Sequence, residues 1–212
     1  MSRQNVDAQT RFNKTKFVED IYSVGMKRHQ KKTLISGVKL IELESHQDDR
    51  GSLTELFRSD WFDNPETIPL QANMSISRKG VLRGLHFHRK QTDFWICVQG
   101  VLQVVLVDVR IGSPSWKEVV SMKLSAEVPA LLTIPKGVAH GYYALQDVIL
   151  VYLVDALYDG TDEHGLLWCD HVLDLPWALQ GKPVISERDR SNSEFELLFK
   201  NKGFLQYENS NQ

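Results

Sequence analysis

The sequence has few cysteines, and it contains neither a long apolar run nor an apolar signal segment. Only two of its 212 residues are cysteines, and neither Cys97 nor Cys169 belongs to a CxxC pair. Two such thiols do not make a disulfide framework, which favours a reducing compartment. No apolar run approaches the roughly 20 residues of a membrane span, and the start, Met1 to Asn5, lacks the apolar core of a signal peptide. We therefore expect a soluble, cytoplasmic protein that has no membrane partner.

An excess of charge of either sign is also missing. The chain has 25 Lys and Arg residues against 27 Asp and Glu residues, a net charge of -2. Bulk electrostatic binding of nucleic acid or of an anionic membrane is therefore not expected. Apolar residues make up 42% and charged residues 25%, as in ordinary globular domains, and the length suffices for one core without disulfides or metal ions.

The apolar pattern divides the chain into three parts. Residues 1–35 form a polar N-terminal arm, in which the spacing of Phe17, Ile21 and Val24 predicts one side of a short helix. Residues 36–190 form the main domain, and residues 191–212 form a polar C-terminal tail. We expect the tail to pack on the outside of the domain.

Short β-rich runs, each ended by Gly, Pro or Asp, fill the main domain. The predicted strands cover residues 38–43, 52–57, 94–98, 101–107, 116–124, 130–134 and 148–154. The two runs on either side of Gln99-Gly100 predict a hairpin, and residues 58–65 a short helix. Many short strands separated by turns favour an all-β sandwich or barrel over a βαβ fold.

Polar residues of chemical interest stand inside three apolar stretches. The first is Val81-Leu82-Arg83-Gly84-Leu85-His86-Phe87-His88. His86 and His88 share one face of a strand, and a bulge at Gly84 would bring Arg83 to the same face. The second is Pro135-Lys136-Gly137-Val138-Ala139-His140-Gly141, and the third places Tyr152 among aliphatic neighbours.

Two of these stretches resemble the cupin motifs. His86-Phe87-His88, followed by Asp93 and Gly100, is similar to the first motif, with Asp93 where Glu is usual. Residues 135–140 are similar to the second motif. The resemblance implies a double-stranded β-helix, a jelly-roll barrel, with short peripheral helices.

A narrower resemblance, to the dTDP-4-dehydrorhamnose 3,5-epimerase family, covers residues 38–189. The matching segments are Asp49-Arg50-Gly51 with Glu55, residues 71–75, 80–86, 107–110 with Ser113-Pro114, 134–141, 168–170 and 186–189. It implies epimerisation of a nucleotide-linked 4-keto-6-deoxy sugar at C3, C5 or both, in deoxysugar and polysaccharide biosynthesis. The ketone acidifies the neighbouring C–H bonds, so a base can form an enolate that an acid reprotonates on the opposite face.

The resemblance also implies roles for single residues. His86 would be the base, Asp189 its orienting partner and Tyr152 the acid. Substrate-binding positions would be Arg50, Glu55, Gln71, Asn73, Arg83 and His140. No cofactor is implied. The family exchanges its N-terminal β-rich portion between subunits, which predicts a homodimer.

Two positions depart from the family pattern. The family usually has Lys where this chain has Asp93, and Gln where it has His88. A carboxylate beside a developing enolate would raise the barrier that a cation lowers. Three arrangements remove the conflict: Asp93 binds a metal ion, pairs with Arg89, Lys90 or Arg83, or is protonated because burial raises its pKa. We expect the pairing first, because Arg89 and Lys90 are close in the sequence.

Two other functions stay open at this point. His86, His88, Asp93 and His140 would form a three-histidine, one-carboxylate set for a divalent metal, which makes a metal-binding cupin the first alternative. A non-catalytic sugar-nucleotide binding module is the second, favoured by the loss of the lysine. Metal ligation by His86 through its reactive nitrogen and proton abstraction by His86 exclude one another.

Overall fold

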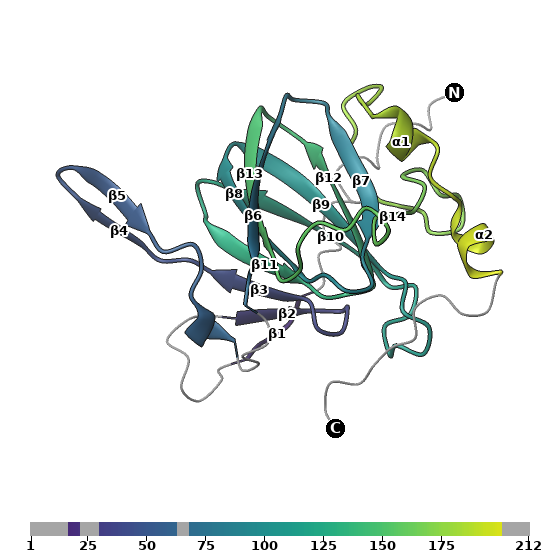
Figure 1. The fold of residues 1–212 in the computed structure, drawn as a ribbon. Helices are drawn as coiled ribbons and strands as arrows, with labels where there is room; N and C mark the ends of the chain where they lie inside the picture. Colours follow the sequence, from purple (N-terminus) through teal and green to yellow (C-terminus); the bar gives the residue numbers. More distant parts are fainter. Residues whose placement is uncertain (1–16, 22–29, 63–67, 201–212) are drawn as a thin grey trace, which may run out of the picture.

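The computed structural model describes residues 17–21, 30–62 and 68–200. The fold is built almost entirely from strands (Figure 1). In chain order the elements are β1 (Phe17–Ile21), β2 (Gln30–Thr33), β3 (Lys39–Glu42), β4 (Ser45–Asp48), β5 (Gly51–Thr54), the 3-10 helix η2 (Ser59–Trp61), β6 (Gln71–Ser77), β7 (Leu82–Phe87), β8 (Asp93–Gln99), β9 (Val101–Asp108), β10 (Val119–Ser125), β11 (Ala130–Ile134), β12 (Val138–Ala144), β13 (Val148–Val154), β14 (His164–Gly165), α1 (Glu187–Arg190) and α2 (Phe195–Phe199).

Two antiparallel sheets form the barrel. Among the described residues, seven strands follow the order β1-β2-β3-β11-β8-β13-β6, and five follow the order β10-β9-β12-β7-β14. Strands β4 and β5 make a separate ribbon that projects away from the barrel (Figure 1). The jelly-roll of two sheets with short peripheral helices confirms the predicted fold class.

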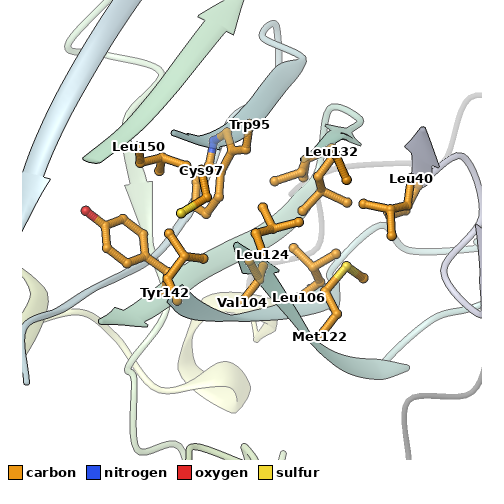
Figure 2. Close-up of a cluster of buried hydrophobic side chains, with 14 of the residues drawn as sticks. Leu40, Trp95, Cys97, Val104, Leu106, Met122, Leu124, Leu132, Tyr142 and Leu150 are labelled. Atoms are coloured by element: carbon orange, nitrogen blue, oxygen red, sulfur yellow. The ribbon is translucent and has the colours of Figure 1, made fainter. Parts of the chain in front are cut away.

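The barrel core lies between the two sheets because alternate side chains of each strand point inward. Trp95, Cys97 and Leu150 come from the larger sheet and pack with Val104 and Leu106 of the smaller one (Figure 2). The intervening residues of these strands form two further clusters on the outer faces. Strands β11 and β12 are buried along their whole length, although β12 carries His140.

Two outer clusters cover the sheets and position the peripheral elements. Phe94 and Ile96 pack under Trp61 of η2, and Leu85 and Phe87 pack near Phe195 of α2. Figure 1 shows α1 and α2 beside β7 and β14. This packing fixes the segment before α2, which carries Asp189, against the strand that carries His86. Among the described residues, no helix combines the length and apolar character needed to cross a membrane.

Several local predictions are corrected. β8 and β9 do not pair as a hairpin: β8 lies between β11 and β13, whereas β9 lies between β10 and β12, so the chain passes from one sheet to the other at Gly100. Phe17–Ile21 is a strand paired with β2, not part of a helix; Val24 lies outside the described residues. In the stretch predicted as a helix from residue 58 to 65, the described part holds only the short η2.

Candidate functional site

Sheet register brings the predicted polar residues to the inner face of the barrel. Tyr152 on β13 is paired with Asn73 on β6 and with Trp95 on β8. Val154, two residues on, is paired with Asp93. Directly paired residues share a face of the sheet, and Trp95 belongs to the core between the sheets. Tyr152, Asn73 and Asp93 therefore face the interior, together with that core.

The smaller sheet supplies the opposite wall. His86 on β7 is paired with His140 on β12, and the His140 ring meets the Trp95 ring edge-on with centroids 5.2 Å apart. The two sheets thus touch at this point, and His86 and Tyr152 belong to different walls of the barrel. A substrate held between these walls would have a candidate base on one side and a candidate acid on the other.

The irregularity predicted at Gly84 is present. The register of β7 against β12 shifts between the pairs His140–His86 and Tyr142–Arg83. Gly84 has φ +112, and a Cβ atom there would lie 2.7 Å from Gly141 Cα and 2.7 Å from the His140 carbonyl oxygen. Only glycine fits this close approach of two strands. The same residue donates its N–H to Asp189 Oδ2 at 3.1 Å, so the bulge also helps to hold the candidate orienting carboxylate.

His86 and Asp189 form the closest ion pair of the site. His86 Nε2 lies 2.6 Å from Asp189 Oδ1, although 103 residues separate them. Ser186, the N-cap of α1, accepts a hydrogen bond from Asp189 N. Burial alone would raise the pKa of Asp189, but hydrogen bonds from His86 and from Gly84 N–H outweigh it, and the pKa lies below its usual value. Asp189 is therefore an anion that fixes one imidazole nitrogen and leaves the other for a proton.

The second nitrogen of His86 is available for chemistry. The side chain is 25% exposed, against 6% for Asp189. Nδ1 makes no hydrogen bond to any of the described residues. An oriented imidazole with one unoccupied, accessible nitrogen is what a general base requires.

Tyr152 meets the requirements for a candidate acid. Its ring is half-buried, and its hydroxyl makes no hydrogen bond to the described residues. Burial raises the pKa of Tyr152, and the carboxyl groups of Asp93 and Glu163 raise it further, while Arg83 lowers it. The phenol consequently keeps its proton at neutral pH.

Arg83 reaches the same region from β7. Its Nε donates to Ser77 Oγ at 2.9 Å, and Ser77 Oγ lies 2.9 Å from the Tyr142 hydroxyl. The side chain is otherwise exposed. Nη2 also donates to the Ile76 carbonyl at 3.4 Å. A guanidinium held in this way on an exposed side chain is suited to an anionic ligand group such as a phosphate.

A second polar group, which we call the buried triad, consists of His88, Asp93 and His140. Each side chain is at most 7% exposed. Asp93 Oδ2 lies 3.3 Å from His140 Nε2 and 3.7 Å from His88 Nε2. One possible ligand atom from each residue lies within 4.8 Å of the others, so these three could hold a metal ion. His86, the fourth member of the predicted set, is engaged with Asp189 instead.

The predicted pairing of Asp93 with a cation is wrong. Among the described residues Asp93 forms no ion pair with lysine or arginine. Asp162 accepts the backbone N–H groups of Arg89 and Lys90, and Lys90 Nζ pairs with Asp159. The chain turns at Arg89-Lys90 so that both side chains are exposed, whereas Asp93 begins an inward-facing row of β8.

Burial dominates the protonation of the buried triad. It raises the pKa of Asp93 to about 8, against a lowering by the Gln91 hydrogen bond. Burial likewise lowers the pKa of His88, although Glu163 raises it, and lowers that of His140 still further. Both imidazoles are therefore neutral at pH 7.

The remaining predicted substrate residues fall into two groups. Gln71 and Asn73 lie on β6 beside β13, joined by a hydrogen bond of 2.9 Å between their side chains. Arg50 and Glu55 lie on or next to the projecting β4–β5 ribbon (Figure 1), where Arg50 pairs with Asp48 and Glu55 with Arg58. The single chain does not bring these two to the barrel interior.

Residues 162 and 163 contribute contacts that were not predicted. The Asp162 carbonyl oxygen lies 3.1 Å from His88 Nδ1. Glu163 Oε1 lies 3.5 Å from the same nitrogen and pairs through Oε2 with Arg188. The acidic run before β14, Asp159 to Glu163, was the available signal, but nothing local links it to a histidine 74 residues away.

Comparison with known proteins identifies the family to which this domain is similar. The family model of dTDP-4-dehydrorhamnose 3,5-epimerase matches residues 32–196. The dTDP-4-dehydrorhamnose 3,5-epimerase of Sinorhizobium fredii is 40% identical over 164 residues, which cover 74% of this chain and 84% of the relative.

Solved structures with a similar fold are epimerases of the same kind. The dTDP-6-deoxy-D-glucose-3,5-epimerase of Legionella pneumophila, in complex with dTDP-4-keto-L-rhamnose, is 30% identical with a TM-score of 0.77, and the match covers 84% of this chain and 97% of that one. ChmJ, a 3'-monoepimerase of Streptomyces bikiniensis in complex with dTDP-quinovose, is also 30% identical, with a TM-score of 0.72 and coverages of 76% and 85%. The chain belongs to the dTDP-4-dehydrorhamnose 3,5-epimerase family.

Proposed function

We propose that this protein is an epimerase of a dTDP-linked 4-keto-6-deoxy sugar, acting in deoxysugar and polysaccharide biosynthesis. The observation that carries the proposal is the His86–Asp189 pair on one wall and Tyr152 on the other wall of the barrel. Neither His86 Nδ1 nor the Tyr152 hydroxyl makes a hydrogen bond to the described residues. The relatives include a 3,5-epimerase and a 3'-monoepimerase. The proposal therefore covers inversion at C3, with or without C5.

The chemistry needs one proton to leave and another to arrive. His86 removes the proton from the carbon beside the ketone, and the C–H electron pair moves to form an enolate whose negative charge rests on the ketone oxygen. Asp189 stabilises the resulting imidazolium. Tyr152 then gives its proton to the opposite face of the same carbon, and the ketone reforms. Both transfers use protein side chains, so we expect them to need no organic cofactor.

Binding roles follow from position. Arg83 has donors left for a phosphate, and Gln71 and Asn73 offer side chains on the Tyr152 wall. We assign a pocket role also to His140, which lies on the same wall as His86. We place the activity in residues 36–190 and in the cytoplasm, where the absence of a disulfide framework is expected.

We further propose that the active unit is a homodimer. The β4–β5 ribbon carries Arg50 and Glu55 away from the barrel of its own chain, and edge strand β6 exposes Met74 and Ile76 by 65% and 63%. An exposed edge with apolar side chains favours pairing with another chain, and a second copy would bring its ribbon to this barrel. Light scattering at micromolar concentration should give twice the 24.3 kDa chain mass; a monomer would contradict the dimer.

Deuterium wash-in tests the reaction. A dTDP-4-keto-6-deoxy sugar incubated with the protein in heavy water should gain deuterium beside the ketone. His86→Asn should abolish the exchange, while Tyr152→Phe should permit exchange and slow the completed inversion, because the acid acts after the enolate forms. The exposed His171 offers a matched control, and His171→Asn should exchange at the wild-type rate. Equal exchange by wild type and His86→Asn would remove His86 as the base.

A further inference from the structure

When Asp93 is ionised, the buried triad lacks hydrogen atoms where its three side chains meet. A carbonyl oxygen can only accept, so His140 Nδ1 donates to the Val138 carbonyl at 2.9 Å and His88 Nδ1 donates to the Asp162 carbonyl at 3.1 Å. In a neutral imidazole the other nitrogen is then a bare lone pair. Both Nε2 lone pairs therefore face Asp93 Oδ2. When Asp93 is ionised, three acceptors surround one point. A proton on Asp93 or a metal ion between the three atoms satisfies them, and because burial raises the pKa of Asp93 to about 8, a metal ion competes with that proton.

The separations suit a metal ion. With metal–ligand bonds of roughly 2.1 Å, neighbouring ligand atoms lie about 3–3.5 Å apart. The Asp93–His140 distance of 3.3 Å falls in this range, and the Asp93–His88 distance of 3.7 Å is slightly longer. A small rotation of the His88 ring would close the difference.

The groups behind the triad also match those of metal centres. A histidine ligand usually donates its other N–H to a carbonyl or carboxylate, which fixes the tautomer. His88 and His140 both do so, and Gln91 Nε2 donates to the remaining Asp93 oxygen, Oδ1, at 2.9 Å. Every outward-facing polar atom of the triad is thus satisfied, and only the inward-facing lone pairs are not.

We propose that His88 Nε2, His140 Nε2 and Asp93 Oδ2 bind one divalent first-row transition metal ion. Two imidazoles and one carboxylate suit manganese, iron, cobalt, nickel or zinc, whereas calcium and magnesium prefer oxygen ligands. His86 is not a ligand, because its Nε2 is 2.6 Å from Asp189. Metal binding and proton abstraction by His86 are therefore compatible in this chain.

The ion would stand on the inner face that also carries Tyr152, the wall against which the proposed substrate would bind. It would polarise the ketone oxygen and stabilise the enolate charge, the task for which Asp93 itself has the wrong sign. This role rests on the proposed function, but the binding of the ion does not.

The test measures metal directly. Purified protein, stripped with a chelator and dialysed, is titrated with Co²⁺ while its visible ligand-field absorption is recorded, and elemental analysis of the unstripped protein identifies the native ion. We expect about one equivalent of Co²⁺ per chain. Asp93→Asn and His88→Gln should each weaken binding at least tenfold, and the double variant should abolish the absorption bands. Circular dichroism and thermal unfolding of each variant confirm that the fold is retained.

Two controls separate this proposal from the proposed reaction. His86→Asn should bind Co²⁺ like the wild type although it no longer exchanges deuterium, and His171→Asn should leave both unchanged. The proposal is overturned if the stripped wild type binds no Co²⁺ at millimolar concentration, or if the folded double variant binds as well as the wild type. Co²⁺ binding without deuterium exchange by the wild type would instead overturn the proposed reaction and leave the metal site standing.

Discussion

Of the five buried aspartates among the described residues, the two least exposed, Asp93 and Asp108, have opposite surroundings. Asp108, at the end of β9, accepts five hydrogen bonds, from the backbone N–H, Nε and Nη2 of Arg110 and from the hydroxyls of Ser113 and Ser115. Asp93, at the start of β8, accepts from only the Gln91 amide among the described residues, and its Oδ2 lies 3.3 Å from His140 Nε2 and 3.7 Å from His88 Nε2. Their exposed fractions are 0% and 2%.

The same cost of burial therefore has two outcomes. Burial would raise the pKa of Asp108, but Arg110 and the two serines outweigh it and the pKa falls below its usual value. At Asp93 the single amide donor does not offset burial, and the pKa rises to about 8. A saturated carboxylate is structural, whereas a carboxylate left short of donors marks a site that awaits a cation or a ligand.

The largest expected effect comes from making the same change at both positions. Asp108→Asn leaves the Arg110 guanidinium buried without a counter-charge and should lower the free energy of unfolding by about 3–5 kcal/mol. Asp93→Asn removes a carboxyl group whose ionisation opposes folding, so it should leave the free energy of unfolding at pH 7 unchanged or raise it. Urea denaturation at pH 7 with a chelator measures both. Comparable losses would break the contrast.

The pH dependence of stability should also have opposite signs. The lowered pKa of Asp108 adds stability above its unfolded pKa, and this stability is lost as the pH falls below about 4. The raised pKa of Asp93 adds stability at low pH that is lost as the pH rises from about 4 through about 8. In metal-free buffer the wild type should thus lose stability relative to Asp93→Asn between pH 5 and pH 9. A constant difference over this interval would mean that Asp93 is not protonated in the fold.

A cation should be tolerated at one aspartate and not at the other. The double variant His88→Gln/Asp93→Lys places the residues usual in the family at both departures, so we expect it to lose Co²⁺ binding and to keep deuterium exchange within about tenfold of the wild type, because the ammonium then stabilises the enolate. Asp108→Lys should not fold, because it buries a second cation beside Arg110. Loss of exchange by a folded double variant would show that this site depends on its own triad.

The smallest effects come from removing single donors. Ser113→Ala should cost about 1 kcal/mol of stability, since four donors to Asp108 remain, and leave exchange unchanged. Gln91→Ala should barely change stability but weaken Co²⁺ binding roughly tenfold, as loss of a group behind a ligand does. Urea denaturation midpoints and Co²⁺ titrations of the two variants measure these effects. A loss of Co²⁺ affinity in Ser113→Ala, or a loss of stability confined to Gln91→Ala, would contradict the structural role of Asp108 and the metal-binding role of Asp93.

Local signals predicted much of this structure correctly. The β-rich runs at residues 130–134 and 148–154 became β11 and β13 with the same bounds, because such apolar, β-branched stretches fit a buried sheet. Asp108 and Arg110 are two residues apart and bond directly, so this pair depends on a local segment alone. The irregularity at Gly84 was predicted from the need to align Arg83 with His86. The family resemblance predicted that Asp189 orients His86, and the two side chains lie 2.6 Å apart.

What the sequence by itself determined is the class of fold, the family and the chemical types at the site, since period-2 patterns, turns and ordered motifs are local. The tertiary structure alone decided which neighbours each residue has. It sent β8 and β9 to different sheets, drew Phe17–Ile21 into a strand and placed Asp93 against His88 and His140 instead of Arg89 and Lys90. Strand pairing and side-chain burial depend on segments far apart in the chain, and closeness in sequence says little about the partners of an inward-facing residue.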